Sequence, residues 1–472
     1  MRFAMNAMAR LFASMAISTL MVQVALAQVN ESDTRVSAIE MIGRDLVRLL
    51  NQLTEGEKDP TKRLPITPVL EKAAKAVQNS PTFQQAQVSK KSIDGQRKEA
   101  RAGLLPQVSF GTGSGTREYD VSASSGGFTR NSGDYTTRTL TAKQLIYDFG
   151  GAWSSMSAAE KRLTAIELKV QAQRSEIFLQ ALKIFYETQR GLLQVRLARE
   201  NLQARRAFVN FIRERSDLGA SSSADVVRAE SRVAVALDAL SSSLQTLAQA
   251  QASYRQFYNT EAEPYILPKE ITYEGLDLQN IEQFIDLHPA KLEAEMSLQA
   301  ANDELNAAKS KYIGGLYLEV SKGQTKNPGS SQFIADNTTM LMYRGELYSG
   351  GAQTARVEQA VAKVEQAQLE VEKIRQDLLR SLREAYADYN GQVAGVAARM
   401  LVFKGAEDSY AIAKDLYAFS RSSLFEVLKS QEDLFNAGQR LIDSVVNRAQ
   451  AKYKLLHAAQ VLISRVNENN TP

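Results

Sequence analysis

The sequence contains no cysteine, which excludes a disulfide framework and a lipid-modified N-terminal cysteine. Only two histidines occur, His288 and His457, and neither belongs to a cluster of residues with the spacing of a metal site. No glycine-rich phosphate loop and no nucleophile elbow can be found in the sequence. We therefore expect no catalytic residue, no metal ion and no cofactor, and a protein that is not an enzyme.

Long apolar runs are also missing. After residue 27 no run of about 18 apolar residues appears, so no transmembrane helix is expected. Residues 1–27 have the pattern of a secretory signal peptide, because Arg2 and Arg10 form a positive region before a short apolar stretch, which is followed by the A-x-A pattern Ala25-Leu26-Ala27. The formal net charge is +4 with both signs interspersed, which argues against a nucleic-acid partner. These features predict an exported protein and leave open whether it is periplasmic, secreted or in the outer membrane.

What the sequence does contain is an internal repeat. The segment Tyr147-Asp148-Phe149-Gly150-Gly151 has a counterpart in Tyr348-Ser349-Gly350-Gly351, with an offset of 201 residues. This offset then holds for about 80 residues without a gap. Earlier in each half the offset is 208, as Pro81 and Pro289 show. The difference predicts a longer surface loop, rich in glycine and serine, in the first half.

Each half is predicted to contain a very long helix that pairs with the helix after it. Residues 152–215 lack proline, and at about 1.5 Å per residue such a helix would span roughly 95 Å. An apolar seam with a period of seven must be buried against helices at 225–258 and 424–467. Shorter helices are expected at 66–102 and 278–311. The seam residues are Met156, Leu163, Val170, Ile177, Ile184, Val357, Val364, Val371, Leu378 and Ala385.

Between these helices the apolar period changes to two, which is typical of β-strands. Leu316, Leu318 and Val320 alternate with polar residues, and residues 341–347 and 107–110 show the same alternation. Polar loops are expected at 116–134 and 325–336. Each half therefore predicts one hairpin with strands of about ten residues, the length that crosses a bilayer in a barrel.

Four strands cannot close a barrel, and an open sheet in lipid would leave edge N–H and C=O groups unpaired. Three chains would supply twelve strands. Glu319, Arg344 and Glu346 are predicted to face a water-filled lumen. The expected fold is mainly α with β: a long antiparallel coiled-coil helical tunnel plus a four-strand contribution to a shared transmembrane β-barrel, internally duplicated.

This order of elements resembles the TolC family of outer-membrane factors. The resemblance is carried by the segment Ala102-Gly103-Leu104-Leu105-Pro106-Gln107-Val108, by the segment at Tyr147 to Gly151 and by the two helix-pair turns. It implies a homotrimer in the outer membrane of a Gram-negative cell, in contact with outer-membrane lipid and extending into the periplasm. It also implies a periplasmic adaptor (membrane fusion protein) and an inner-membrane ABC or RND transporter as partners.

The resemblance places a gate at the periplasmic tips of the helix pairs. Family members close the tip with an acid of the first turn that is linked to a tyrosine and an arginine of the second. The matching positions here are Asp225, Tyr417 and Ser422, with Arg421 one residue away. The arginine of this link is therefore displaced.

The family also narrows its pore with two acidic residues three positions apart after the second turn. Glu426 occupies the first position and Lys429 the second, so we expect weaker cation selectivity than two carboxylate rings would give. The residues expected at the adaptor-docking tips are Gly219, Ala220, Ser221, Ser420, Ser423 and Leu424.

The predicted function is a passive exit duct for type I secretion of a protein substrate. The absence of an N-terminal lipid-modified cysteine and the charged extension at 28–65 favour this choice over a small-molecule efflux duct of an RND or ABC pump. A periplasmic coiled-coil scaffold without a barrel is a further alternative.

The predicted domains are a signal peptide (1–27), an N-terminal extension (28–65), a first repeat (66–277, with a hairpin at about 105–147 and a helix pair at 152–258), a second repeat (278–467, with a hairpin at about 313–348 and a helix pair at 352–467) and a tail (468–472).

Overall fold

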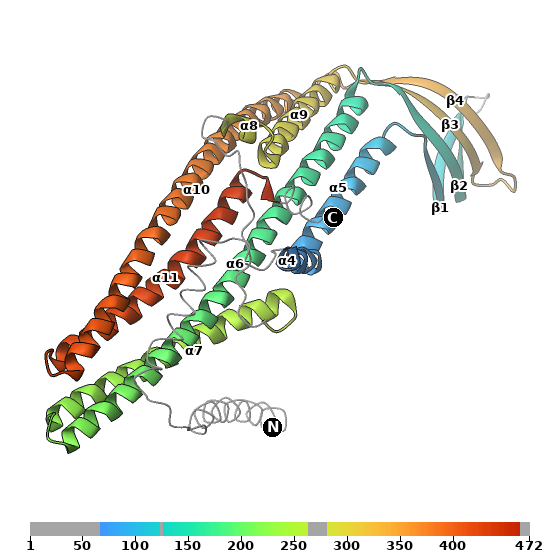
Figure 1. Cartoon of the computed structure of the whole chain (residues 1–472). Helices are drawn as coiled ribbons and strands as arrows, with labels where there is room; N and C mark the ends of the chain where they lie inside the picture. The colour runs from blue at the N-terminus through green and yellow to red at the C-terminus, as the bar shows by residue number, and fades with distance from the viewer. Residues whose placement is uncertain (1–66, 123–125, 263–280, 463–472) are drawn as a thin grey trace, which may run out of the picture. The chain divides into compact units, whose positions relative to one another are not determined.

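The computed structural model describes residues 67–122, 126–262 and 281–462, which are coloured in Figure 1. The predicted signal peptide (1–27), the extension (28–65), the tail (468–472) and the predicted boundary between the repeats at 277/278 lie outside these residues. The proposed division into domains therefore stays a prediction.

The described chain is mainly helical and contains one four-stranded antiparallel sheet, which confirms the predicted fold class (Figure 1). The same order of helix, hairpin and long helix pair occurs twice. The elements are α4 (Thr67–Asn79), α5 (Pro81–Ala102), β1 (Gln107–Ser122), β2 (Phe128–Tyr147), α6 (Gly151–Asp217), α7 (Ser223–Tyr258), α8 (Ile281–Asp286), α9 (Pro289–Ser310), β3 (Gly315–Lys326), β4 (Ile334–Arg344), α10 (Ala352–Ala418) and α11 (Leu424–Ala458).

The shorter helices are each interrupted, in contrast to the single helices predicted at 66–102 and 278–311. Ser80 separates α4 from α5, and His288 precedes α9; both have extended backbone, with ψ values of 129° and 127°. Each is followed by a proline, Pro81 or Pro289, at the first position of the next helix. Proline lacks an N–H and forces the residue before it out of the helical region, so the break follows from the sequence.

The duplication extends to the backbone. Residues with positive φ recur at the offset of 201, as at Phe149 (φ 55) and Gly350 (φ 63), and at Asn259 (φ 53) and Gln460 (φ 55). Each long helix begins after a side-chain cap. The Asp148 carboxylate accepts from the N–H of Ala152 at 2.6 Å, and in the second half the Ser349 hydroxyl accepts from the N–H of Gln353 at 3.2 Å. The repeat seen in the sequence is therefore a repeat of helix boundaries.

The chain forms two compact units. The first, which we call the sheet unit, includes the described parts of 60–193, 246–402 and 440–472. Its helices bury a core in which large aromatic side chains meet: Tyr186 and Tyr453 are fully buried, and the Tyr258 hydroxyl donates to the carbonyl of Ala181 at 2.8 Å. The predicted seam contributes Ile177 to this core.

The second unit, which we call the tip unit, includes residues 194–245 and 403–439. It contains the helix-pair turns and the adjoining parts of α6, α7, α10 and α11. Its buried apolar residues come from all four helices: Leu197, Val209, Ile212, Ala229, Ala236, Phe403, Ala413, Val427 and Leu434.

The sheet has the strand order β1-β2-β3-β4 with every pair antiparallel. Within the four strands, β1 and β4 are each paired on one side only, which leaves two edge strands. The pairing of β2 with β3 runs from Thr136↔Lys326 to Tyr147↔Leu316, with an irregularity between Leu145 and Tyr147. The two hairpins, from distant parts of the sequence, thus join into one sheet.

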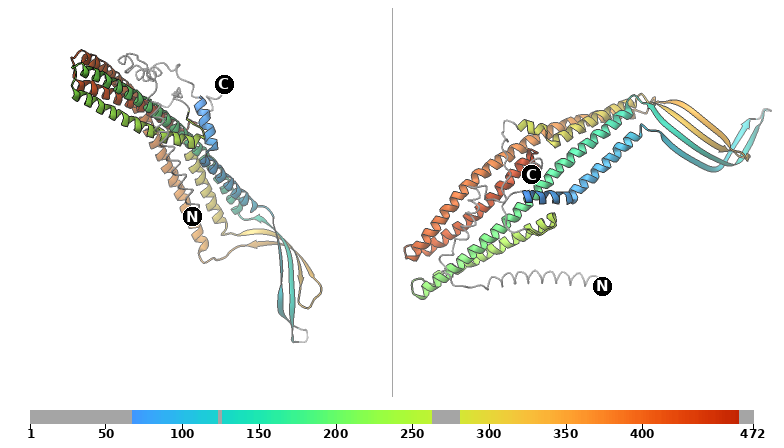
Figure 2. Two further views of the ribbon diagram at one scale, coloured as in Figure 1. Left: turned by 90° about the horizontal axis from the view of Figure 1, so that it is seen from below. Right: turned by 45° about the vertical axis from the view of Figure 1, so that its right-hand side comes forward.

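The first hairpin is longer than predicted. β1 has 16 residues and β2 has 20, against 12 and 11 for β3 and β4. The prediction of a loop at 116–134 was wrong, because the strands β1 and β2 pair Arg117 with Gly133 and Asp120 with Arg130. Polar residues occupy both sides of this ribbon, so the apolar alternation that would have marked it as strand is missing. In Figure 2 the first hairpin reaches beyond the second.

Candidate functional site

The first helices of the two helix pairs end in the same way, in the tip unit. At the end of α6, Gly219 has a φ of 75°, and the N–H of Ala220 donates to the carbonyl of Arg215 at 2.7 Å. At the end of α10, Ser420 has a φ of 58°, and the N–H of Arg421 makes the equivalent bond at 2.8 Å. This is the Schellman pattern, in which a left-handed residue allows the last carbonyls of a helix to be satisfied.

The second helix of each pair begins with a capping arrangement. The Ser222 hydroxyl accepts from the N–H of Asp225 at 3.2 Å, and the Asp225 carboxylate accepts from the N–H of Ser222 at 3.3 Å. The Ser423 hydroxyl accepts from the N–H of Glu426 at 3.3 Å, and the Ser422 hydroxyl donates to the Glu426 carboxylate at 2.8 Å. Both acids predicted for the gate therefore stabilise the first turns of α7 and α11.

One side chain, Arg215, connects the two turns. Its guanidinium donates to the carbonyl of Ala418 at 3.1 Å and to the Ser420 hydroxyl at 2.9 Å. It also lies 5.2 Å from the ring centroid of Tyr417 and 5.7 Å from that of Phe211. Because Arg215 belongs to α6 and three of these partners follow or end α10, charge-assisted hydrogen bonds and cation–π contacts join the first helix pair to the second.

The residues of the predicted gate link contact partners other than those that the resemblance implies. Tyr417 is buried, and its hydroxyl is 3.3 Å from that of Ser221. Asp225 forms an ion pair with Arg228 of its own helix at 3.3 Å. Arg421 is exposed at the turn. Sequence reasoning missed Arg215, whose only signal was its place in the last turn of α6.

The surface of the tips is more apolar than their sequence motifs suggest. Leu218 is 84% exposed, Phe419 77% and Phe425 70%. Leu424, predicted as a docking residue, is buried beneath this surface. Among the other predicted tip residues, Gly219, Ala220, Ser423, Glu426 and Lys429 are exposed, so they are accessible to a partner or to solvent. Exposed apolar side chains of this size on adjacent turns are typical of interaction surfaces.

A buried polar cluster lies deeper in the tip unit. Arg205 is 3% exposed; it donates to the Asn201 side chain at 3.2 Å and to the carbonyl of Arg232 at 3.3 Å. At the half-exposed edge of this cluster, Arg232 forms an ion pair with Glu432 at 2.9 Å. Burial lowers the pKa of Arg205, against the opposing effect of the Glu432 carboxylate, and burial raises the pKa of Tyr410 to about 12. Removing one partner of such a cluster would leave a buried polar group unpaired.

In the half of the sheet next to the helices, which belongs to the other unit, one face is mainly apolar and the other combines charged residues with Met340 and Met342. Residues that alternate along a strand and residues that pair across strands share a face. One face carries exposed apolar side chains on all four strands: Val108, Phe110, Leu140, Leu318, Val320, Leu341 and Tyr343. This face confirms the alternation seen in the second hairpin and extends it across the first.

The opposite face carries charge. Arg344 forms an ion pair with Glu319 at 3.0 Å. Lys143 is paired with Glu319 in the strand register, and its ammonium lies 4.3 Å from the ring centroid of Tyr317. Sequence reasoning missed Lys143, because only the register with β3 reveals its neighbours. Glu346 lies beyond the last residue of β4, so the strand predicted through residue 347 is too long.

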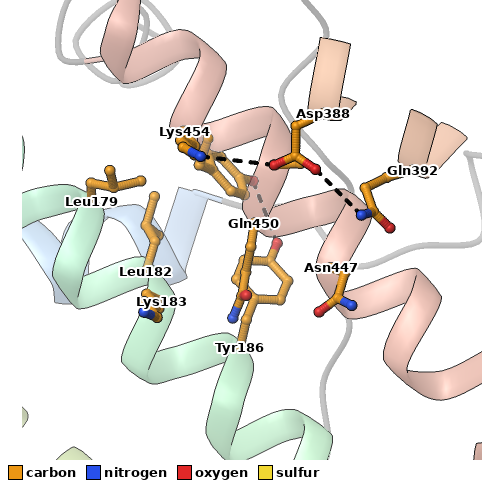
Figure 3. A pocket seen from close by; sticks show the side chains of 11 residues that line it. Leu179, Leu182, Lys183, Tyr186, Asp388, Gln392, Asn447, Gln450 and Lys454 are labelled. Atoms are coloured by element: carbon orange, nitrogen blue, oxygen red, sulfur yellow. Dashed lines mark hydrogen bonds and ion pairs between the residues drawn. The ribbon is translucent and has the colours of Figure 1, made fainter. Parts of the chain in front are cut away.

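Two of the clefts in the sheet unit have volumes of about 720 and 420 Å³. The larger lies at the helix end of the sheet; its lining includes Lys311, Arg344, Glu346 and Arg356, so charges of both signs meet there. The smaller lies among α6, α10 and α11 (Figure 3). Its rim pairs Asp388 with Lys454 at 3.9 Å and with the Gln392 amide at 3.3 Å.

Across the part of the chain that the structure describes, no group of three or more His, Asp and Glu side chains is arranged to hold a metal ion. Within the same residues, no helix combines the length and the apolar character needed to cross a membrane.

The comparisons with known proteins agree with this architecture. The family model described as "Outer membrane efflux protein" matches residues 73–260 and 280–459. The outer membrane efflux protein BepC of Brucella suis is 23% identical over 338 residues, covering 69% of this chain and 73% of its own. The alkaline protease secretion protein AprF of Pseudomonas aeruginosa is 21% identical over 399 residues, 81% of each chain.

Among solved structures, the outer membrane protein VceC of Vibrio cholerae superposes with a TM-score of 0.70 at 18% identity, covering 84% of this chain and 95% of its own. This likeness shows a shared fold. The family model covers both halves of the chain, including both long helix pairs and all four strands. The chain therefore belongs to the outer membrane efflux protein family.

Proposed function

We propose that this protein is the outer-membrane channel of a tripartite export system and that three copies share one twelve-stranded barrel. The observation that carries the proposal is the open four-stranded sheet, whose half next to the helices has a mainly apolar face opposite a face that carries charge. An apolar face of this extent is unfavourable in water, and the charged face is unfavourable in lipid. A barrel with the apolar face outward and the charged face inward satisfies both.

The edges of the sheet support a shared barrel. β1 and β4 each have a row of main-chain N–H and C=O groups on their outer side, and a bilayer offers no water to satisfy them. Pairing β4 of one copy with β1 of the next closes the sheet without any further strand. Twelve strands are an even number within the range of outer-membrane barrels.

The helix-pair turns are the proposed periplasmic gate and docking site. Arg215 holds the two helix pairs together, and separating them would break its bonds to Ala418 and Ser420. The exposed apolar residues Leu218, Phe419 and Phe425 suit a periplasmic adaptor, with an inner-membrane ABC or RND transporter behind it. In a trimer, Glu426 would form a ring of three carboxylates, partly offset by Lys429.

The cargo in this proposal is a protein delivered by type I secretion. The similarity to the protease secretion protein AprF extends over 81% of this chain, a larger share than the similarity to BepC. The second candidate is efflux of small molecules, which the similarity to BepC and to the toluene efflux pump protein TtgC of Pseudomonas putida favours. Both candidates use the same passive duct.

The experiment that tests the channel is purification from the outer-membrane fraction in mild detergent, followed by mass determination and by conductance measurements in planar bilayers. We expect a trimer that conducts ions with a weak preference for cations, and a reduced preference in Glu426→Ala. A monomer that is released from membranes by carbonate would contradict the proposal and favour a coiled-coil scaffold.

The cargo is tested in the source organism by deleting the gene. Loss of one or more proteins from the culture supernatant, with unchanged drug susceptibility, is expected for type I secretion. The reverse result would replace it with small-molecule efflux.

A further inference from the structure

The apolar face of the sheet ends in a group of positive charges near the hairpin turns. Along β3, Leu318 and Val320 are followed on the same face by Lys322 and then by Lys326. Lys322 is two residues beyond Val320, about 7 Å along the strand. The neighbouring strand β2 repeats the order, because Arg138 is two residues from Leu140 on this face.

The strand register brings the three cations together. Leu140 is paired with Lys322, Arg138 with Gln324 and Thr136 with Lys326. Arg138 is therefore the diagonal neighbour of both lysines, at a typical separation of about 7–8 Å between backbone positions. We call Arg138, Lys322 and Lys326 the basic cluster.

One acidic residue borders this part of the face: Asp134 lies two residues from Thr136 and is therefore, like Arg138, a diagonal neighbour of Lys326. From the apolar residues to the basic cluster, the side chains on this face of β1 to β4 are apolar, neutral or basic. Glu118 and Asp120 occur farther along the first hairpin, where Arg130 pairs with them at 3.1 and 3.3 Å. The opposite face, in contrast, mixes both signs at Lys143, Glu319 and Arg344. With three cations and one bordering carboxylate, the basic cluster is a surface of net positive charge.

The side chains of the cluster are available to a ligand. Arg138 and Lys322 are exposed and Lys326 is half-buried. The Arg138 guanidinium lies 5.3 Å from the ring centroid of Phe333, which holds it over the turn between β3 and β4 without neutralising its charge. Neutral donors and acceptors, Gln324 and Asn337, lie beside the lysines in the register.

We propose that the basic cluster binds the phosphate groups of lipids in the outer leaflet of the outer membrane. This inference rests on the proposed barrel, in which the apolar face contacts the acyl chains. Cations that directly follow such a band lie at the depth of the lipid headgroups, where long basic side chains can reach phosphate oxygens. The hairpin turns are at the end of the sheet opposite to the helices, which places the cluster in the leaflet away from the periplasm (Figure 1).

The occupant that fits is a phosphorylated lipid rather than a soluble anion. A free phosphate could bind the cations but would gain nothing from the apolar side chains two residues away. A lipid with phosphates and several acyl chains contacts both surfaces at once. For the outer leaflet of a Gram-negative cell, this chemistry describes lipid A.

The experiment uses the full-length protein, extracted as its oligomer and delipidated in detergent. Lipid A, dephosphorylated lipid A and inorganic phosphate are titrated separately, and bound lipid is measured by native mass spectrometry. The test variant carries Arg138→Gln, Lys322→Gln and Lys326→Gln. The matched control carries Arg117→Gln, Arg130→Gln and Lys143→Gln, which remove three cations of the same sheet outside the cluster.

We expect the wild type and the control to bind lipid A and to discriminate against its dephosphorylated form. Each cation removed from the cluster should weaken binding about fivefold. Equal binding of the test variant and the control would overturn the inference, as would equal binding of the two lipids by the wild type. If inorganic phosphate alone saturates the site at similar concentrations, the ligand is a soluble anion and the lipid assignment is wrong.

These outcomes are separate from those of the channel proposal. A wild-type protein that forms no membrane oligomer refutes the barrel and, with it, the lipid site. A wild-type oligomer that binds lipid A and dephosphorylated lipid A equally well refutes only the lipid site. If the test variant fails to assemble, the comparison of the two lipids on the wild type still decides the question.

Discussion

The two halves of the chain repeat the same order of elements but have different side chains at the points where the backbone turns. In the first half the turn from helix to β1 contains Pro106, and in the second half Gly314 stands at the matching position with a φ of 90°. Ser80 precedes the proline helix in one half and His288 in the other. The comparison shows that the positions of helix ends are kept while the residues that form them change. Replacing a residue at one of these turns therefore tests how much that residue contributes to the turn, compared with the residue at the matching position in the other half.

The largest effect is expected at Gly314. A Cβ atom there would lie 2.4 Å from the carbonyl oxygen of Arg344, and the φ of 90° is unfavourable for any other residue. Gly314→Ala should destabilise the start of β3 by about 3 kcal/mol or more, because both the backbone strain and the contact must be relieved. The amount of heat-stable oligomer in the outer-membrane fraction measures this effect.

The matched control for Gly314 is Gly111→Ala in the first hairpin, where an added Cβ meets no heavy atom within 4 Å. It should leave the yield of oligomer unchanged. Equal yields of the two variants would show that the turn before β3 adapts more easily than its backbone suggests.

The next effect concerns the acid stability of the second half. Burial, and then the nearby charge of His457, lower the pKa of His288 from 6.5 to about 4. Above pH 6.5 the imidazole is neutral in the folded and the unfolded chain. As the pH falls from 6.5 towards 4, the unfolded chain takes up a proton that the folded chain does not, so about 2–3 kcal/mol of stability is lost.

The variant His288→Ser restores the residue of the first half and keeps a side chain that can cap α9. Its urea midpoint should depend less on pH between 4 and 6.5 than that of the wild type, with similar values at pH 7.5. An unchanged pH profile would mean that His288 does not contribute to the acid sensitivity.

A smaller effect is expected at the turns of the helix pairs. Arg215 makes two hydrogen bonds and two ring contacts with the residues around it, whereas the displaced Arg421 is exposed. Arg215→Ala should lower the free energy that holds the pairs together by about 1–2 kcal/mol, because the site is partly solvated. In planar bilayers the open fraction should rise about tenfold.

Arg421→Ala is the matched variant, since it removes the same kind of side chain from the other turn. It should leave the conductance close to that of the wild type. A larger effect of Arg421→Ala than of Arg215→Ala would restore the link that the family resemblance implies, with Arg421 as its arginine.

The smallest effect separates strain from hydrogen bonding at Ser420. Ser420→Ala removes the bond to Arg215 and keeps the unfavourable φ of 58°, while Ser420→Gly removes the bond and relieves the strain. The glycine variant should therefore be more stable than the alanine variant by about 1 kcal/mol. Thermal unfolding compares them. The reciprocal change Gly219→Ser should cost a similar amount, and no difference in either turn would exclude backbone strain as the reason for glycine there.

The sequence was sufficient to predict the fold because its signals are local and repeated. Proline-free stretches with a period of seven predicted α6 and α10, and the alternation at Leu316 to Val320 predicted β3. The polar ribbon at 116–134 could not be predicted as strand, since neither of its sides is apolar. The breaks before Pro81 and Pro289 could have been predicted from proline alone, but the helical pattern on both sides concealed them.

The site was less accessible to sequence reasoning than the fold. Asp225 and Glu426 were selected for a gate, and the structure shows the capping bonds that such acids make at helix starts. Arg215 acts between helices that are about 200 residues apart in the chain, and no local pattern marks such a contact. Lys143 and the basic cluster became visible only with the register between β2 and β3, which depends on pairing across the two halves.

The pairing of β2 with β3 also affects the kinetics of folding. Each hairpin can form from neighbouring residues, whereas β2 can pair with β3 only after α6 to α9 have been synthesised. Long-range strand pairing is slow, and free strand edges are prone to pair with other chains. Since all copies carry the same edges, β2 of one chain can pair with β3 of another during assembly. If the protein forms the proposed trimer, its rate of assembly should therefore depend on whether β2 and β3 of one chain pair before a second chain arrives.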